Sequence, residues 1–318
     1  MASIVSGQLK DASVKGKPRD LMDTIFNVAP TDTPFLTMCG QTTASQTLHE
    51  WQTDTLASPA ENAALEGADS ADFAASVTTE LSNKTQILKK AINVSGTAQA
   101  VKQAGVTKQY AYQMALRTKE LKKDVEYALL QNKVARADNG SSEGRLMTGL
   151  PCWMQANYAG AGTKSDGSST ACTAGTARVP TEAMLKTLLT SVYNAGGNPD
   201  CIMMAPDIRV KLSEVLSGGA TRIEKAEQKK ATSVIDVYVS DFGTLKLVPN
   251  RVQAFEPFSK TCAFVLDPQY WKVAYLRGFT EERLAVTGDS LKGHVLVECT
   301  LEARNDASSG VLADLKAA

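Results

Sequence analysis

The stretch His49-Glu50-Trp51 holds residue types that could do chemistry, because a histidine beside a glutamate offers a metal ligand and a general base. A zinc-protease motif, however, needs a second histidine one helical turn away, so that both imidazoles point the same way. The chain has only two histidines, and residues 47–56 alternate with a period of two, which is typical of a strand. We therefore predict a structural strand, with Trp51 on one face and Glu50 and Asp54 on the other.

Other short motifs give no better site. Asp241-Phe242-Gly243 resembles the metal-binding loop of kinases, but no other kinase motif accompanies it, so a hairpin turn is expected. The glycine-rich segment 159–179 lacks the strand-to-helix frame and the lysine of a phosphate-binding loop. His294 lies in a strand-like run without a nucleophilic setting. We predict no catalytic, cofactor-binding or metal site and no enzymatic activity.

Composition narrows the class of protein further. The 318 residues carry no formal net charge and are 43% hydrophobic, as in an ordinary globular protein. The absence of an apolar run of about 18 residues predicts no membrane partner, and residues 1–20 do not read as a signal peptide. No cysteine pair has metal-ligand spacing, so buried, reduced thiols in a cytoplasmic setting are expected. The six cysteines are Cys39, Cys152, Cys172, Cys201, Cys262 and Cys299.

Charge is balanced in total but segregated along the chain. Between Arg19 and Lys84 there is no lysine or arginine, and the same interval holds ten aspartates and glutamates. Residues 84–136 reverse the balance, with eleven basic residues against three acidic ones. Blocks of opposite sign suggest that one segment contacts the other, within one chain or between chains. Two independently solvated faces are the alternative.

The elements that must position these residues follow from periodicity. Residues 1–30 read as a polar arm, followed by an extended segment around Pro30 and Pro34. Strands over 48–55 and 78–97 predict a long hairpin with an acidic tip, which needs another surface to support it. A helix over 107–137 would be a rod of about 45 Å. After Pro180, helices and short strands alternate, so the fold class is α+β.

Two stretches, "NVAPTDTPFLTMCG" and "LHEWQTDTLA", give this order of elements a more specific meaning. Over about residues 23–57 the chain resembles a podophage-like subfamily of the tailed-bacteriophage major capsid proteins, which have the Hong Kong ninety-seven-type fold. The resemblance implies an N-arm, an extended β-hairpin loop, a long spine helix, a peripheral domain and an axial α/β domain. These map onto residues 1–47 for the arm, 48–97 for the loop, 98–180 and 268–318 for the peripheral domain with its helix at 107–137, and 181–267 for the axial domain.

The function that the resemblance implies is that of a major capsid protein. Copies would self-assemble into hexamers and pentamers of an icosahedral head that encloses double-stranded DNA, in the cytoplasm of a host bacterium. Scaffolding and portal proteins are expected partners, because the arm begins without a long helical scaffold of its own. The shell of a phage-derived nanocompartment, or an α/β hydrolase built on the C-terminal half, are the alternatives.

The charge pattern then predicts which residues meet between subunits. An acidic loop would lie across a basic surface of a neighbour, where weak exposed pairs set the register reversibly. The alternative use of the basic residues is contact with the phosphates of packaged DNA. The expected contact residues are Glu50, Trp51, Asp54, Glu61, Glu66, Asp69, Asp72, Lys84, Lys89, Lys90, Arg117, Lys119, Lys122 and Lys123.

Overall fold

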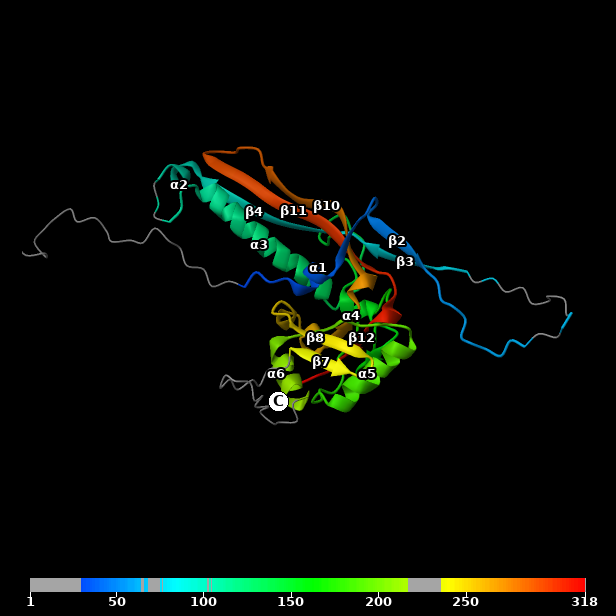
Figure 1. Ribbon diagram of the computed structural model, residues 1–318. Coiled ribbons are helices and arrows are strands. Elements are labelled where there is room, and N and C mark those ends of the chain that lie inside the picture. Colours follow the sequence, from blue (N-terminus) through cyan, green and yellow to red (C-terminus); the bar gives the residue numbers. More distant parts are fainter. Residues whose placement is uncertain are drawn as a thin grey trace, which may run out of the picture.

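The elements form an elongated lobe, a rounder lobe beside it and a loop that projects from their junction (Figure 1). The structure is a computed structural model that describes residues 30–63, 66–67, 75, 77–101, 103, 105–216 and 236–317. The predicted arm, most of the predicted acidic tip and residues 217–235 lie outside the described residues.

A four-stranded sheet backs the elongated lobe. Its strand order is β1-β10-β11-β4, with bounds Gly40–Thr43, Trp271–Arg283, Ser290–Ala303 and Gln86–Ser95. Strand β11 pairs antiparallel with both β10 and β4, and β1 adds in parallel to β10. Helix α3 (Gln109–Leu130) packs along β4 and β11 and buries Met114, Leu121 and Val125 against Val297. The short helix α2 (Gly96–Ala100) follows β4 at the far end of this lobe.

Helix α3 is shorter than the predicted 107–137. Gln131 leaves the helix with an extended backbone, at φ −66° and ψ 142°. Its side-chain amide reaches the carbonyl oxygen of Met147, and that of Asn132 donates to the carbonyl oxygen of Cys172 at 2.7 Å. These bonds to distant segments replace the next helical turn, although the local sequence favours a helix.

The rounder lobe contains a mixed six-stranded sheet of order β5-β12-β9-β6-β8-β7. The strands are β5 (Tyr158–Ala159), β12 (Gly310–Leu312), β9 (Ala263–Leu266), β6 (Cys201–Met204), β8 (Gly243–Pro249) and β7 (Val237–Ser240). Helices α5 (Glu182–Asn194) and α6 (Pro206–Leu216) pack on one face. The remaining short helices are α4 (Leu150–Trp153), η2 (Gln253–Phe255), η3 (Ser259–Thr261), η4 (Pro268–Tyr270) and η5 (Asp306–Ser308).

Strand β6 belongs to two cores because successive side chains of a strand point to opposite faces. Ile202 and Met204 pack with the residues of α5 and α6. Cys201 and Met203 pack into a second core, which also contains the buried residues of α3 and β11. The two lobes therefore share one core, because the second face of the six-stranded sheet packs into the core of the elongated lobe.

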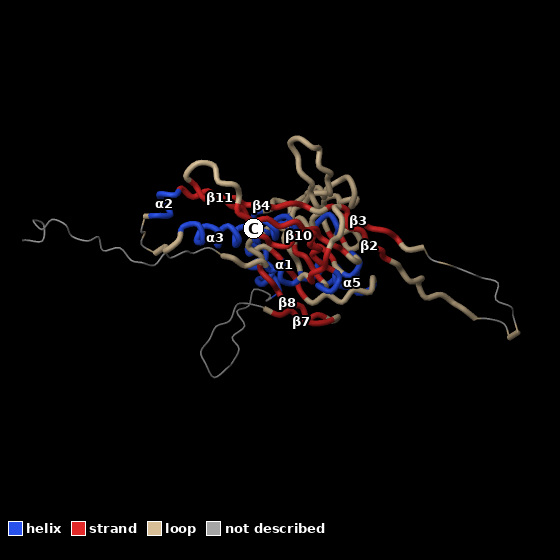
Figure 2. Tube along the Cα trace, turned by 90° about the horizontal axis from the view of Figure 1, so that it is seen from above, coloured by secondary structure: helices blue, strands red, loops and turns tan. Residues whose placement is uncertain are grey.

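Strands β2 (Leu48–Thr53) and β3 (Thr79–Lys84) pair antiparallel and form the base of the projecting loop, defined here as residues 48–84. The prediction of one strand over 78–97 is wrong, because β4 turns away and pairs with β11 instead of β2. Thr85 separates the two strands and is fully buried. Residues 54–60 continue away from the body in both views (Figures 1 and 2).

The segment around Pro34 contains a helix that the sequence did not predict. Thr33 before the proline is neither helical nor fully extended, with φ −128° and ψ 76°, and α1 (Pro34–Met38) begins directly after it. Proline is tolerated in the first turn of a helix because its missing N–H would have no helical partner there. Five residues are too few to show a helical period, so the pattern alone could not reveal this helix.

Several smaller predictions are confirmed. Asp241 and Phe242 form the turn between β7 and β8, and His294 lies within β11. All six cysteines are buried and free. Within the described residues, no helix combines the length and the hydropathy needed to cross a membrane.

Candidate assembly surfaces

The base of the projecting loop is fixed to its own chain by aromatic side chains. The exposure of β2 alternates, with His49, Trp51 and Thr53 half-buried and their neighbours exposed, as predicted. The Trp51 indole Nε1 donates to the carbonyl oxygen of Ala303 at 2.8 Å, and its ring lies 5.4 Å from that of Trp153. His49 Nε2 lies 2.9 Å from Glu302 Oε2, so the imidazole contacts a carboxylate of β11.

Asn83 fastens the second strand of the loop. Its side-chain amide donates to the carbonyl oxygens of Leu301 at 2.8 Å and Thr148 at 3.2 Å. Its Oδ1 accepts from the backbone N–H of Thr148 at 2.9 Å. Asn83 is only 1% exposed, so these hydrogen bonds satisfy polar atoms that water cannot reach.

A buried carboxylate holds the point where the loop joins the sheet. Glu298 of β11 accepts from Arg145 Nη2 at 2.5 Å and from Arg277 Nε at 2.8 Å. It also accepts from the Thr85 hydroxyl at 2.9 Å, and Arg145 Nε donates to the carbonyl oxygen of Thr85. Since Thr85 separates β3 from β4, this network determines where the loop leaves the sheet.

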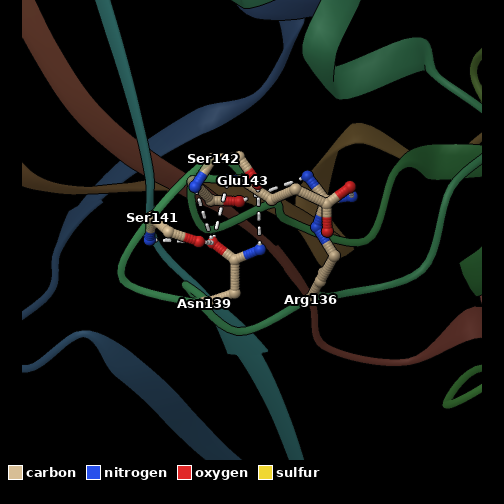
Figure 3. A network of polar contacts seen from close by, with 6 residues as sticks. Arg136, Asn139, Ser141, Ser142 and Glu143 are labelled. Carbon is tan, nitrogen blue, oxygen red and sulfur yellow. Dashed lines mark hydrogen bonds and ion pairs between the residues drawn. The ribbon is translucent and has the colours of Figure 1, made fainter.

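The segment 136–146, which contains Arg145, is closed by local polar contacts around Asn139 (Figure 3). Asn139 Oδ1 accepts from the backbone N–H groups of Ser141, Ser142 and Glu143, and Arg136 pairs with Glu143 at 3.0 Å. The backbones of residues 136 and 146 bond to each other in both directions. Because local bonds close this turn, the backbone of Arg145 has a defined position.

The distal part of the loop is open to solvent. The side chains of the described residues 54–63 are exposed, and Leu56 keeps 99% of its surface accessible. Glu50, Glu61 and Glu66 are exposed as well, whereas Asp69 and Asp72 lie outside the described residues. Glu61 and Glu66 therefore lie beyond the anchored strands, whereas Glu50 lies on the exposed face of β2.

The predicted basic surface is divided by the structure. Lys90 pairs within the chain with Asp124 at 2.9 Å and Glu120 at 3.5 Å, and the bond to Asp124 raises the pKa of Lys90. Arg117 Nη1 contacts Glu120 at 2.6 Å. Trp51, Lys90 and Arg117 thus have partners in their own chain, which the charge pattern did not reveal.

The other basic residues of the predicted contact set form no ion pair among the described residues. Lys89 lies exposed on β4, and Lys84 is half-buried at the end of β3. Lys119 and Lys122 are exposed on α3, and Lys123 is half-buried beside them; these three are called the basic face of α3 below. Their contact with a neighbouring subunit stays a prediction.

Glu126 on α3 orients the segment before the loop. Its two carboxylate oxygens accept from the backbone N–H groups of Phe35 at 2.9 Å and Leu36 at 2.7 Å, and Asn250 donates to it at 2.6 Å. Its side chain is completely buried, and this burial raises its pKa. Glu126 thus caps α1 from another element.

Among the described residues, no group of three or more histidine, cysteine or acidic side chains could hold a metal ion. The polar networks described above fix the base of the loop, its exit from the sheet and α1.

Comparison with solved structures gives the class of protein. The chain superposes on the capsid asymmetric unit of cyanophage A-1(L) with a TM-score of 0.65 at 15% identity, covering 96% of this chain and 99% of that one. The match to Gordonia phage Cozz has a TM-score of 0.62 at 11% identity over 99% and 98% of the two chains. The fold is therefore that of tailed-phage capsid proteins, as predicted. An encapsulin complex from Synechococcus elongatus PCC 7942 shares this fold, with a TM-score of 0.58 at 12% identity over 98% and 97% of the chains.

Sequence comparison identifies the family. The major capsid protein of Escherichia phage Phieco32 is 30% identical over 93% of this chain and 94% of its own length. The family model described as SU10 major capsid protein matches residues 5–316. The chain belongs to this family. The predicted function of a phage major capsid protein is thereby confirmed. The nanocompartment alternative is not favoured, because only the shared fold supports it.

Proposed function

We propose that copies of this chain assemble into hexamers and pentamers of an icosahedral phage head, each copy laying its projecting loop on a neighbour. The observation that carries the proposal is the contrast between the two halves of the loop. Its base is fastened at Trp51, Asn83 and Thr85, while residues 54–63 are exposed. A fixed base aims the loop outward, and its exposed apolar side chains, such as Leu56, gain stability when a neighbour covers them.

Charge supports the same contact. The loop carries Glu50, Glu61 and Glu66 at exposed positions. Lys90 and Arg117 form ion pairs within the chain, so the basic face of α3 is the cationic group best placed to meet these carboxylates. Each exposed pair contributes about 0–1 kcal/mol, so many weak contacts let misplaced subunits dissociate and rebind. Such reversibility favours a closed and regular shell over random aggregation.

Electron microscopy of the purified full-length chain tests this function. Closed shells or capsomer rings are expected, and a uniform monomer under all assembly conditions would contradict it. A variant with Lys122→Glu and Lys123→Glu should fold like the parent, by circular dichroism, but assemble poorly and respond less to salt. Normal shells with unchanged salt sensitivity would remove the basic face of α3 from the contact.

Packaged double-stranded DNA, a scaffolding protein and a portal protein are further partners in this proposal, with assembly in the cytoplasm of a host bacterium. As the alternative to the loop contact, the basic face of α3 would bind the phosphates of this DNA without sequence preference. Binding of the unassembled chain to double-stranded DNA, with affinity that falls steeply with salt and is lost in the Lys122→Glu and Lys123→Glu variant, would assign these lysines to DNA. The proposal includes no catalytic role for the chain.

A further inference from the structure

Two of the cysteines lie against each other although they come from different segments of the chain. Cys152 belongs to α4, and Cys172 lies in the glycine-rich loop that follows β5. Their thiols hydrogen-bond to each other. Cys172 Sγ also lies 3.4 Å from the carbonyl oxygen of Pro151, which belongs to the peptide bond that leads into Cys152. The contact is therefore close enough for the two sulfur atoms to react with each other.

Asn132, just beyond the end of α3, holds both cysteines in place. Its Oδ1 accepts from the backbone N–H of Cys172 at 3.0 Å and lies 3.3 Å from Cys152 Sγ. Its side-chain amide donates to the carbonyl oxygen of Cys172 at 2.7 Å. One side chain thus fixes the backbone of one cysteine and the thiol of the other. Thiols held in hydrogen-bond contact need only a small movement of the side chains to form a sulfur–sulfur bond.

The contact makes the two thiols chemically unequal. The hydrogen bond between them lowers the pKa of Cys172 and raises the pKa of Cys152. Because the thiolate is the form that attacks an oxidant, Cys172 is the nucleophile and Cys152 is the resolving thiol. Cys172 is also nearer to the surface, since it is 5% exposed and its neighbour Thr173 is exposed, whereas Cys152 has no exposed surface. A small oxidant therefore reaches Cys172 first.

The other four cysteines lack this arrangement. Burial raises the pKa of Cys39, Cys201, Cys262 and Cys299. Among the described residues, the thiols of Cys201 and Cys262 contact a methionine sulfur or carbonyl oxygens instead of another thiol. Cys172 contributes to the raised pKa of Cys262, which makes Cys262 the competing partner.

We propose that Cys152 and Cys172 form an intrachain disulfide when the chain meets a hydroperoxide outside a reducing cytoplasm. The Cys172 sulfur attacks one peroxide oxygen and the O–O bond breaks, which gives a sulfenic acid on Cys172 and one water. The Cys152 sulfur then attacks the Cys172 sulfur, the S–O bond breaks, and hydroxide leaves with the Cys152 proton as a second water. The two sulfur atoms together lose two electrons, and the peroxide gains them.

The bond would close a ring over residues 152–172, which contains β5. This strand pairs with β12 only over Tyr158 and Ala159, so little else in the sheet holds it. A disulfide stabilises mainly by restricting the unfolded chain, and oxidation should raise the melting temperature by about 5 °C. The setting rests on the proposed function, because a phage head leaves the reducing cytoplasm of its host, but the reaction itself needs no second copy.

Peptide mapping of the purified, unassembled full-length chain tests the proposal. The chain is treated with hydrogen peroxide, unfolded in an alkylating reagent that blocks free thiols, and digested with trypsin. Cleavage after Arg145, Lys164 and Arg178 places the two cysteines on separate peptides, 146–164 and 165–178. These peptides should be found joined, and the joined product should form about tenfold faster than any other cysteine is oxidised. Dithiothreitol should separate them and reverse the rise in melting temperature.

Mixing isotope-labelled and unlabelled chains distinguishes a bond within one chain from a bond between chains. Joined peptides with mixed labels, a bond from Cys172 to Cys262, or oxidation of Cys172 to a sulfinic acid without any bond would each overturn the proposal. Cys152→Ala should abolish the joined product and Cys299→Ala should not, and the wild-type chain decides the question even where a variant does not fold. Because the test uses unassembled chains, a failure to form shells would contradict the proposed function and leave the disulfide standing.

Discussion

Trp51 Nε1 donates a hydrogen bond of 2.8 Å to the carbonyl oxygen of Ala303, which ties the first strand of the projecting loop to the last residue of β11. The two residues are separated by 252 positions in the chain. The loop therefore has two parts: a base that is hydrogen-bonded to its own subunit, and a distal part whose side chains are exposed. This division supports reading the loop as a directed arm of the capsid subunit.

Replacing Trp51 with phenylalanine tests the anchor. The ring stays beside Trp153 but the bond to Ala303 is lost, so the free energy of unfolding should fall by about 1 kcal/mol. Urea unfolding followed by far-ultraviolet circular dichroism measures this change. Leu56→Ala is the matched control on the exposed part of the loop and should leave stability unchanged. Equal effects of both variants would contradict an anchor at Trp51.

Glu298→Gln should be among the costlier single changes in the four-stranded sheet. It removes the charge that two arginines share and leaves both with a neutral acceptor. Loss of a buried charge partner costs about 3–5 kcal/mol, but Arg277 is 48% exposed and stays partly solvated, so about 2 kcal/mol is expected. Denaturant unfolding measures the loss. Glu50→Gln, at an exposed position of β2, serves as the control, and a similar small effect at both sites would refute the role given to Glu298.

Glu126 should make stability depend on pH in a defined direction. Burial raises its pKa in the folded chain above the ordinary value of 4.5, so the folded state holds this proton more tightly than the unfolded state. Its contribution is fully present below pH 4.5 and is lost as the pH rises through the folded pKa. The difference in unfolding free energy between the wild type and Glu126→Gln should therefore shift against the wild type over this range. Parallel pH profiles for the two proteins would show that Glu126 does not titrate in this way.

Gly149 is required by a close approach of two backbones. A Cβ atom added there would overlap the carbonyl oxygen of Gln131, the residue that directly follows α3. Because backbone cannot move aside as a side chain can, Gly149→Ala should lower the free energy of unfolding by about 3 kcal/mol. Gly144→Ala meets no atom within 4 Å and is the matched control. Thermal unfolding of both variants distinguishes them, and an equally stable Gly149→Ala protein would disprove the contact.

Much of the fold could be predicted because its signals are local. The alternation around Trp51 predicted β2 and its two faces, and periodicity predicted the long helix α3, although not where it ends. The segregated charge predicted an acidic loop, and the exposed Glu50, Glu61 and Glu66 agree with it. These properties depend only on a residue and its near neighbours in the chain.

The residues that position the loop were missed. Asn83, Thr85, Arg145 and Glu298 form the base of the loop, and none stood out in the sequence. One signal was present, since Glu298 is an acid within an otherwise apolar stretch of β11 whose burial demands a charged partner. That stretch could not say which of the many arginines would be the partner.

By itself, the amino-acid sequence determined the family, the order of the elements and the separation of acidic from basic segments, because composition and period carry this information along the chain. Only the tertiary structure decided where the loop ends and which cations are already paired. Thr85 meets Glu298 across 213 positions, and Lys90 meets Asp124 across the gap between a strand and a helix. Such contacts join residues that are far apart in the sequence, so a local pattern cannot predict which residues will pair.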